Sequence, residues 1–373
     1  MTIYNILQNY NWDEVKSSIY SKTPKDVDIA LSTSKPSLED FKALISPAAK
    51  PYLEQMAALS RNATLKRFGK TVQMYAPLYL SNVCYNGCIY CGFSFKNKIK
   101  RKTLTDEEIL IEAKAIKALG YDHILLVSGE ADNIVDLNYF INAIRIVKPY
   151  FSNISMEVQP LDQDEYLALH NEGVYAVLVY QETYNQGNYN YYHPKGKKSH
   201  YQYRVETPDR IGASHMHKAG LGVLLGLDDW RANSFYCAVH LDYLQRTYWQ
   251  TKYSISFPRI RPASGVEFQY QHVTDSDLVQ LICAYRLFNN DVELSISTRE
   301  TPKFRDNIIK LGITSISAGS KTNPGGYAVE PQALEQFVVN DARSCDEVFK
   351  MIQKQGYEPI WKDWDRTYNS ISK

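Results

Sequence analysis

The chain has 373 residues, 44% of them hydrophobic, and its 42 lysines and arginines nearly balance its 41 aspartates and glutamates. The net charge is +1 and no basic or acidic block dominates, which argues against nucleic acids and anionic membranes as partners, because both select for clustered lysine and arginine. No apolar run approaches the roughly 18–20 residues of a membrane span. Residues 1–12 lack the basic and apolar regions of a secretory signal, so we expect a cytoplasmic location.

The first 70 residues have a polar, mostly helical pattern that is interrupted by Pro24, Pro36, Pro47 and Pro51. We expect residues 1–70 to form a helical extension that packs on the main domain. The main domain is expected to span residues 71–320, followed by a C-terminal extension of residues 321–373.

From residue 72 onward, short β-rich runs alternate with helical stretches. Thr105 and Glu108 form a capping box at one helix start, and Thr274 with Asp277 resembles another. Four glycines stand just before predicted strands, where the residue that ends a helix is expected: Gly120, Gly173, Gly220 and Gly312. Eight strands alternating with helices predict an α/β fold, a (β/α)8 TIM-type barrel. The predicted strands are residues 72–80, 123–127, 155–159, 175–180, 221–225, 253–257, 292–297 and 313–317.

Polar and charged residues follow seven of these predicted strands. The active site of such a barrel lies at the C-terminal ends of its strands, so we expect these residues to converge on one rim. They are residues 84–93, Ser128 to Glu130, Glu157 and Gln159, residues 181–184, Asp228 and Asp229, residues 259–261, and residues 298–300.

Three of the six cysteines, Cys84, Cys88 and Cys91, fall within eight residues. A tight cysteine cluster in a long chain of this kind indicates metal binding rather than a disulfide scaffold. Three thiolates leave one iron of a 4Fe–4S cluster without a protein ligand. The alternative is a structural zinc site, which takes four ligands, usually as two close pairs, and no second pair is present. The remaining cysteines are expected to be ordinary helix residues: Cys237, Cys283 and Cys345.

The spacing C-x3-C-x2-C, with Tyr90 before the last cysteine, resembles the radical S-adenosylmethionine (SAM) superfamily. The resemblance implies one 4Fe–4S cluster held by the three cysteines, with SAM on the open iron. It also implies that one electron from the cluster splits SAM and yields a 5′-deoxyadenosyl radical. A low-potential electron donor of the flavodoxin or ferredoxin type is then required.

The same resemblance suggests which residues bind SAM. Ser128-Gly129-Glu130 is similar to the family's G-G-E motif, which receives the SAM amino group, and a carboxylate suits an ammonium. Arg204 is expected to hold the SAM carboxylate, with Arg210 as the alternative. Tyr90 and Glu157 complete the expected set, and residues 222–227 look like the glycine-bearing strand that lies beside the adenine.

Segments across most of the chain resemble the radical SAM tyrosine lyases, which act in thiamin thiazole assembly and in hydrogenase maturation. The resemblance implies cleavage of the Cα–Cβ bond of tyrosine to 2-iminoacetate and 4-cresol, with 5′-deoxyadenosine and methionine as co-products. The matching segments are residues 88–93, 179–184, 222–227, 258–263, 295–300 and 356–365, the last being characteristic of the thiamin enzyme.

The substrate carboxylate needs a cation. Arg299, at the end of the seventh predicted strand, offers a planar fork suited to a carboxylate, and Ser297 offers a hydroxyl. Arg259 and Arg261 are rivals for the same role, and we expect one of them to support the structure.

Two other functions stay open. One is another radical SAM enzyme for an aromatic amino acid, such as a tryptophan lyase, and the other is a non-catalytic zinc protein. A hydrogenase maturase is set aside because only Cys345 lies beyond the predicted barrel. Biotin synthase is set aside because no predicted strand contains a cysteine.

The resemblance also implies a partner, thiazole synthase, which consumes 2-iminoacetate. Trp361 and Trp364 are expected either to anchor that interface or, as the favoured alternative, to pack against the end of the barrel. Residues 193–198 are expected to form a solvated, mobile loop that at most touches an electron donor.

Overall fold

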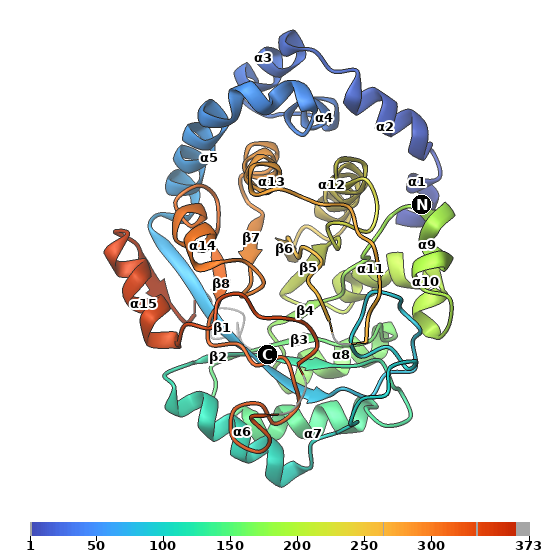
Figure 1. Cartoon of the computed structure of the whole chain (residues 1–373), viewed down its shortest axis with the longest axis vertical. Coiled ribbons are helices and arrows are strands. Elements are labelled where there is room, and N and C mark those ends of the chain that lie inside the picture. The colour runs from blue at the N-terminus through green and yellow to red at the C-terminus, as the bar shows by residue number, and fades with distance from the viewer. Residues whose placement is uncertain (1, 264, 333–334, 363–373) are drawn as a thin grey trace, which may run out of the picture.

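The computed structural model describes residues 2–263, 265–332 and 335–362, and its centre is a closed barrel of eight parallel strands. Each strand pairs with the next along the chain, and β1 pairs with both β8 and β2, which closes the ring (Figure 1). The predicted (β/α)8 fold is therefore confirmed. The strands are β1 (Thr71–Ser81), β2 (His123–Ser128), β3 (Asn153–Glu157), β4 (Ala176–Leu178), β5 (Lys218–Gly222), β6 (Lys252–Ser256), β7 (Glu293–Ile296) and β8 (Ser315–Ser317).

Each predicted strand overlaps an observed one, but the fifth is displaced toward the N-terminus, to Lys218–Gly222. The preceding helix ends near His215, whose φ of 60° is left-handed, so the prediction that Gly220 ends that helix is wrong. Gly220 lies inside β5, where a Cβ atom would come within 2.5 Å of Leu178. A close approach between strands, rather than a helix end, therefore requires this glycine.

Helices on the outside of the barrel begin and end largely as predicted. The capping boxes of Thr105 with Glu108 and of Thr274 with Asp277 are both present. Gly120 and Gly173 have φ values of 94° and 119°, as helix-ending residues should, whereas Gly312 does not have positive φ. The helices are α6 (Asp106–Ala118), α7 (Leu137–Val147), α8 (Gln163–Glu172), α9 (Gln186–Tyr192), α10 (Tyr201–Val205), α11 (Thr207–Ala213), α12 (Trp230–Thr247), α13 (Asp275–Phe288) and α14 (Pro302–Ile308), with a 3-10 turn η2 (Lys197–Ser199).

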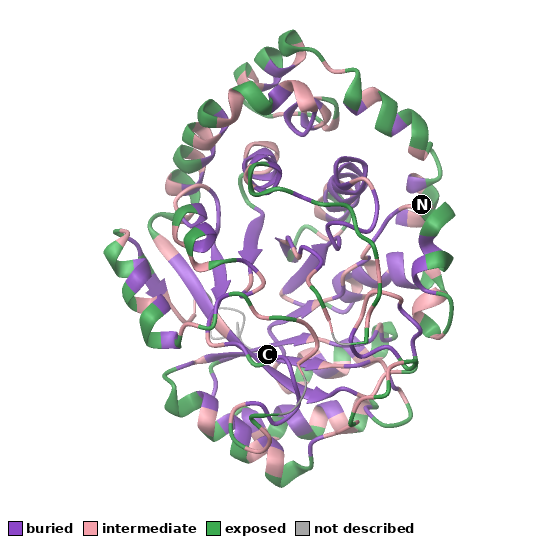
Figure 2. Ribbon diagram, viewed as in Figure 1, coloured by how far each residue is buried: buried purple, intermediate pink, exposed green. Residues whose placement is uncertain are grey.

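The helices before β1 pack on α12 and α13 and bury them on their outer side (Figure 2). Gln280 of α13 donates to the carbonyl of Leu44 at 2.9 Å, and the ring of Phe41 lies 4.9 Å from that of Tyr285. Cys237 and Cys283 are buried in α12 and α13, as expected for ordinary helix residues. These N-terminal elements are α1 (Ile3–Leu7), α2 (Trp12–Tyr20), α3 (Pro24–Ser32), α4 (Leu38–Leu44), η1 (Pro47–Tyr52) and α5 (Leu53–Phe68).

After the barrel come α15 (Cys345–Lys354) and β9 (Glu358–Ile360), a strand that the sequence did not predict. β9 pairs with the first residues of β1, at Thr71 to Gln73. The ring of Trp361 lies 5.3 Å from that of Tyr121 and 6.2 Å from that of Phe349. These contacts favour the prediction that Trp361 packs against the protein over the prediction that it anchors an interface. Trp364 lies outside the described residues. Among the described residues, no helix has both the length and the apolar character to cross a membrane.

Candidate active site at the barrel mouth

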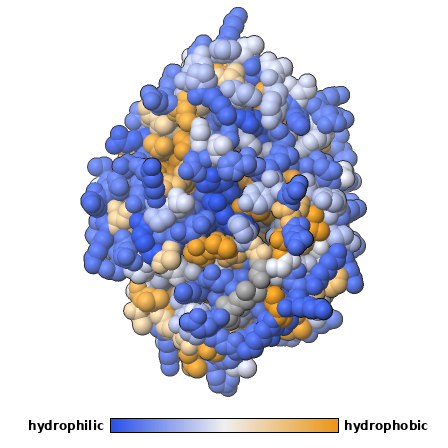
Figure 3. Space-filling view, in the orientation of Figure 1, coloured by the Kyte–Doolittle hydropathy of each residue, from blue (hydrophilic) through white to orange (hydrophobic). Residues whose placement is uncertain are grey.

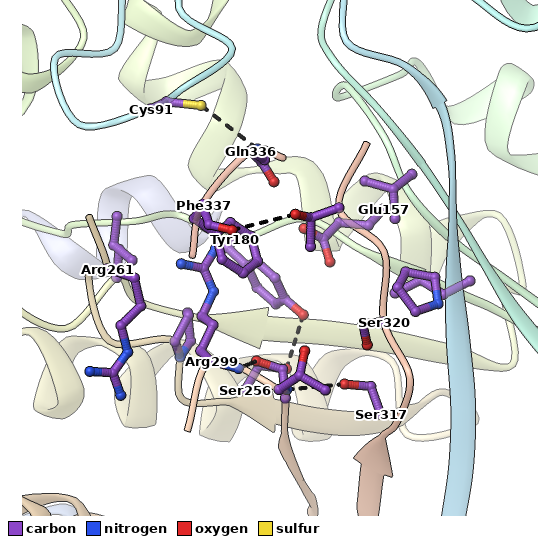
Figure 4. A pocket seen from close by; sticks show the side chains of 18 of the residues that line it. Cys91, Glu157, Tyr180, Ser256, Arg261, Arg299, Ser317, Ser320, Gln336 and Phe337 are labelled. Atoms are coloured by element: carbon purple, nitrogen blue, oxygen red, sulfur yellow. Dashed lines mark hydrogen bonds between the residues drawn. The ribbon is translucent and has the colours of Figure 1, made fainter. Parts of the chain in front are cut away.

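A cavity of about 1140 Å³, counting its opening to solvent, lies at the C-terminal ends of the strands (Figure 4). Its walls include the majority of the predicted catalytic and binding residues, namely Tyr90, Cys91, Glu157, Arg261, Ser297 and Arg299. Many other predicted rim residues do not line it, among them Cys84, Cys88, Glu130, Gln159, Gln181, Asp228 and Asp229. Two of these serve the local fold instead, because Gln159 donates to the carbonyl of Val135 and Asp229 caps α12.

The cysteine loop follows β1 and is fixed by one half-buried cation, Arg101. The guanidinium of Arg101 donates to four carbonyls of this segment, those of Asn82, Phe93, Ser94 and Asn97, at 2.7 to 3.1 Å. Cys88 is buried, whereas Cys84 and Cys91 are partly exposed, and Cys91 reaches the cavity. The guanidinium therefore holds the backbone of this segment together, and Cys91 is the cysteine that lines the cavity.

The donor set of this loop fits an iron–sulfur cluster better than a zinc ion. Burial raises the pKa of Cys84 to about 11 and raises that of Cys88 as well, so both thiols need a bound cation to ionise. Within the described residues, no three His, Cys, Asp or Glu side chains converge tightly enough to hold one metal ion. A single zinc ion requires that convergence, whereas a cluster takes each thiolate on a separate iron.

The predicted SAM-binding residues Glu130 and Arg204 face each other. Arg204 Nη1 donates to Glu130 Oε1 at 2.8 Å, and Asn86 Nδ2 donates to Glu130 Oε2 at 2.7 Å. Burial alone would raise the pKa of Glu130, but the guanidinium of Arg204 holds it below its usual value. This pair adjoins the cavity through Glu182, 4.0 Å from Arg204. Arg210, the alternative, instead donates to the carbonyl of Leu161.

Gly129, between Ser128 and Glu130, is required by a close backbone approach. A Cβ atom there would lie 2.2 Å from the carbonyl oxygen of Val83 and 3.2 Å from the Cβ of Cys84. The backbone N–H of Tyr85 also donates to the carbonyl of Glu130 at 2.9 Å. The end of β2 is thereby held directly against the cysteine loop.

Tyr90 is linked to the segment that we expected to be mobile. His193 is fully buried, and burial lowers its pKa to about 2, so its imidazole is neutral. Its Nδ1 contacts the carbonyl of Tyr189 at 2.9 Å, and a carbonyl can only accept, so Nδ1 carries the proton. Its Nε2 then accepts from the hydroxyl of Tyr90 at 2.7 Å. The prediction of a solvated loop is wrong for His193, although Pro194, Lys195 and Lys197 are exposed.

Three more charged groups meet inside the cavity. Lys198 donates to Glu182 Oε1 at 2.7 Å, and both side chains are largely buried. Glu182 has a φ of 68°, which is rare for a residue with a side chain and which often marks a functional site. Burial and the neighbouring charge of Glu182 raise the pKa of Glu157 to about 7, so that Glu157 is partly protonated at neutral pH.

The three candidate arginines differ in their partners. Glu300, which is almost fully buried, accepts from Arg259 Nε at 3.0 Å and from Arg261 Nη2 at 2.8 Å. The guanidinium of Arg299 instead stacks on the ring of Phe337 at 3.4 Å, and it forms no ion pair within the described part of the chain. Arg299 therefore faces the cavity with no direct ion pair among the described residues, although the carboxylates of Glu157 and Glu182 line the same cavity.

The C-terminal extension supplies part of the site that sequence reasoning missed. We name residues 320–332 and 335–337 the mouth segment. Gln336 accepts from the hydroxyl of Tyr79 at 2.9 Å and donates to Cys91 Sγ at 3.7 Å (Figure 4). The buried carboxylate of Glu112 anchors the segment by accepting from the N–H groups of residues 327–329 at 2.6 to 2.9 Å. No local pattern marks Gln336 or Phe337 as site residues.

Comparisons with known proteins agree with this geometry. Residues 78–235 match the Radical SAM superfamily, and residues 256–358 match the Biotin and Thiamin Synthesis associated domain. The chain is 48% identical to the 2-iminoacetate synthase of Escherichia coli (strain K12), over 95% of this chain and 94% of that protein. The identity to the 2-iminoacetate synthase of Salmonella typhimurium is also 48%, over 95% of this chain and 94% of that protein.

Solved structures show the same fold. A crystal structure of HydG, a maturase of the FeFe-hydrogenase, superposes with a TM-score of 0.88 at 30% identity, covering 94% of this chain and 80% of that one. Methylornithine synthase superposes with a TM-score of 0.72, covering 90% of this chain and 97% of that one, but at 20% identity this likeness concerns the fold alone.

Proposed function

The chain belongs to the 2-iminoacetate synthase family of the radical SAM superfamily, and from this we infer that it cleaves the Cα–Cβ bond of L-tyrosine. The products are 2-iminoacetate and 4-cresol, with 5′-deoxyadenosine and methionine as co-products, and the reaction serves thiamin thiazole synthesis. Its cofactors are a 4Fe–4S cluster and SAM. The observation that carries this function is the 48% identity over nearly the whole chain.

We propose that Cys84, Cys88 and Cys91 hold the cluster. Three observations support this proposal: Arg101 holds the loop together, the loop carries three thiols, and a cavity lies beside Cys91. When bound, the cluster supplies the single electron that converts SAM into the 5′-deoxyadenosyl radical. The protein's own contribution is to keep both reacting molecules in one cavity, since positioning is a large part of such catalysis.

Glu130 and Arg204 are proposed to bind the amino and carboxylate groups of SAM. A zwitterionic amino acid presents one charge to each member of this pair, so it can share their hydrogen bonds without leaving a buried charge unpaired. Glu157 and Tyr90 complete the proposed SAM site. Glu157 offers an acceptor on the cavity wall, and Tyr90 is held in place by His193.

Arg299 is proposed to bind the carboxylate of tyrosine, with Ser297 as an additional hydroxyl donor. The support is that Arg299 lines the cavity without an acidic partner, whereas Glu300 engages Arg259 and Arg261. Arg261 also lines the cavity and has an unpartnered buried Nε among the described groups, so it is the second candidate. Arg259 donates to Glu300 and to the carbonyl of Val273, which is a structural role.

The experiment is anaerobic reconstitution with iron and sulfide, followed by incubation with SAM, dithionite and either tyrosine or tryptophan. We expect 4-cresol and 5′-deoxyadenosine from tyrosine, together with glyoxylate from hydrolysis of 2-iminoacetate. The Cys88→Ala variant is the control and should form no 5′-deoxyadenosine. A tryptophan-derived product without 4-cresol would favour the tryptophan lyase, and a colourless protein that contains zinc would favour the non-catalytic alternative.

Two partner proteins are also proposed. Because 2-iminoacetate hydrolyses readily in water, we propose that thiazole synthase takes it directly from this enzyme in the cytoplasm. A flavodoxin-type or ferredoxin-type carrier is proposed as the source of the electron. We also propose that residues 1–70 and 321–373 act as extensions of a radical SAM barrel formed by residues 71–320, in line with the start of β1 and the end of β8.

A further inference from the structure

An exposed basic and aromatic surface lies on the outer side of the cysteine loop. It consists of Lys96, Lys98, Lys195 and Lys197 with the rings of Tyr85 and Phe95, and we name it the basic patch. All four lysines are exposed, and Tyr85 and Phe95 are 42% and 38% exposed. Figure 3 shows hydrophilic and hydrophobic groups mixed over the face of the molecule that it views.

The basic patch joins two segments that are fixed to each other. The N–H of Gly87 donates to the carbonyl of Lys195 at 2.9 Å, and Lys195 Nζ lies 4.5 Å above the ring of Phe95. Gly196, with φ 93°, approaches the cysteine loop so closely that a Cβ atom would lie 2.2 Å from Asn86 Oδ1. The loop of residues 84–101 thus lies against the segment that follows α9 (Figure 1).

The charge of the basic patch is largely uncompensated. Residues 93–104 contain five lysines and arginines and no acidic residue, and of these Lys100 and Lys102 are paired with Glu330. Lys197 pairs with Asp132, whereas Lys96, Lys98 and Lys195 form no ion pair within the ranges that the structure describes. A positive surface around two exposed rings is complementary to a small acidic protein.

The position of the basic patch determines what that protein would deliver. Tyr85 of the patch directly follows Cys84, and Lys195 of the patch accepts from the N–H of Gly87, the residue before Cys88, so the patch adjoins two proposed cluster ligands. The cavity side of the loop is enclosed by Gln336 and the proposed SAM site. An electron carrier therefore comes nearest to the proposed cluster ligands when it binds on the outer side of the loop, at the basic patch.

We propose that the basic patch docks an acidic carrier of one low-potential electron, of the flavodoxin type, for reduction of the cluster. This inference rests on the proposed function, because only a redox cluster at the cysteine loop needs such a donor. In the docked complex, one electron passes from the reduced flavin, which becomes a semiquinone, to the cluster, and no covalent bond forms or breaks.

The test compares two triple variants with the same change of charge. Lys96→Glu/Lys98→Glu/Lys195→Glu removes the basic patch, and Lys16→Glu/Lys25→Glu/Lys354→Glu reverses three exposed lysines on α2, α3 and α15. Reconstituted proteins are driven either by dithionite or by photoreduced flavodoxin, and 5′-deoxyadenosine formation is measured over a range of salt concentrations. Electrostatic steering raises association rates by about 10- to 1000-fold and falls with ionic strength.

We expect the patch variant to lose about tenfold or more of the flavodoxin-driven rate at low salt while it keeps its dithionite-driven rate. The control variant should keep both rates. Equal flavodoxin-driven rates in the two variants would overturn the proposal. Absence of 4-cresol in the unaltered protein with dithionite would instead contradict the proposed function, independently of docking.

A second variant controls for loss of the cluster in the glutamate variant. If the glutamate variant loses its iron, Lys96→Gln/Lys98→Gln/Lys195→Gln neutralises the same charges with less repulsion. A flavodoxin-driven rate that stays at the unaltered level and keeps its salt dependence in this variant would likewise overturn the proposal.

Discussion

Arg299 shows how much a single side chain depends on its neighbours. Three arginines near the barrel mouth look equivalent in the sequence, and all three were candidates for binding the substrate carboxylate. In the structure, the buried carboxylate of Glu300 forms ion pairs with Arg259 and Arg261. Arg299 is not part of this group and faces the cavity. The sequence contains Glu300, but only the fold reveals which cations surround it.

Replacement of Arg299 by alanine is expected to spare the cluster and SAM binding and to weaken the use of tyrosine. Truncating one side of a buried charge pair costs about 2–5 kcal/mol, which corresponds to a loss of roughly 30-fold or more in kcat/KM. Steady-state 4-cresol formation measures this loss, with Arg246→Ala on the exposed end of α12 as the control. An unchanged apparent tyrosine affinity would transfer the role to Arg261.

Glu157 predicts a pH dependence of stability. Its pKa is about 7 in the folded protein, raised by burial from 4.5, so between these values the folded protein retains a proton that the unfolded chain has released. Stability is therefore lost as the pH rises through this window, by about 3 kcal/mol at most. Urea unfolding of the protein without cofactors at pH 5 and pH 8 should show a smaller loss for Glu157→Gln than for the unaltered chain.

Glu267→Gln, at an exposed position, is the matched control and should follow the unaltered protein. If Glu157→Gln also follows the unaltered protein between these two pH values, the carboxyl of Glu157 is already ionised in the folded state and the argument fails.

At the scale of elements, the closed barrel was predictable from the sequence, and the segment that covers its mouth was not. Eight strands and their capped helices leave local patterns of burial and capping, so the sequence predicts them from short windows. The start of β5 was predicted too late in the chain, because Gly220 permits close packing between strands rather than ending a helix. The mouth segment and the three-residue β9 were missed because contacts with β1, α6 and the cysteine loop define them.

Phe337 tests the contribution of the mouth segment. Its ring stacks on the guanidinium of Arg299, and such cation–π contacts contribute about 0.5–2 kcal/mol. Phe337→Leu should raise the KM for tyrosine about 2- to 30-fold with little effect on SAM cleavage, and Phe337→Tyr, which keeps an aromatic face, should stay near the unaltered value. Equal KM values for Leu and Tyr at this position would show that the stacking does not orient Arg299.

In the whole molecule, the N-terminal helices cover one side of the barrel and the mouth segment covers part of its mouth. Helices α1 to α5 occupy the outer faces of α12 and α13, and Trp361 is packed inside the chain. A partner that receives 2-iminoacetate therefore has the surface around the mouth available, rather than a ring at Trp361.

We expect thiazole synthase to bind at that surface. Co-expression and anaerobic size-exclusion chromatography at low salt, with SAM and tyrosine present, should show the two proteins eluting together. Trp361→Ala should leave the co-elution intact, because its ring packs on Tyr121 and Phe349. Separate elution of the unaltered proteins would exclude a stable complex and leave only transient transfer.

The anchoring of the mouth segment by Glu112 has a consequence for biogenesis. This segment follows β1 and the cysteine loop in the chain, so it leaves the ribosome after them. Before the segment is in place, the contact of Gln336 with Cys91 is missing, and the cysteine loop is more open on that side. Once residues 327–329 reach the carboxylate of Glu112, Gln336 covers Cys91. We therefore expect iron and sulfide to reach the three cysteines more readily before the mouth segment docks than after it.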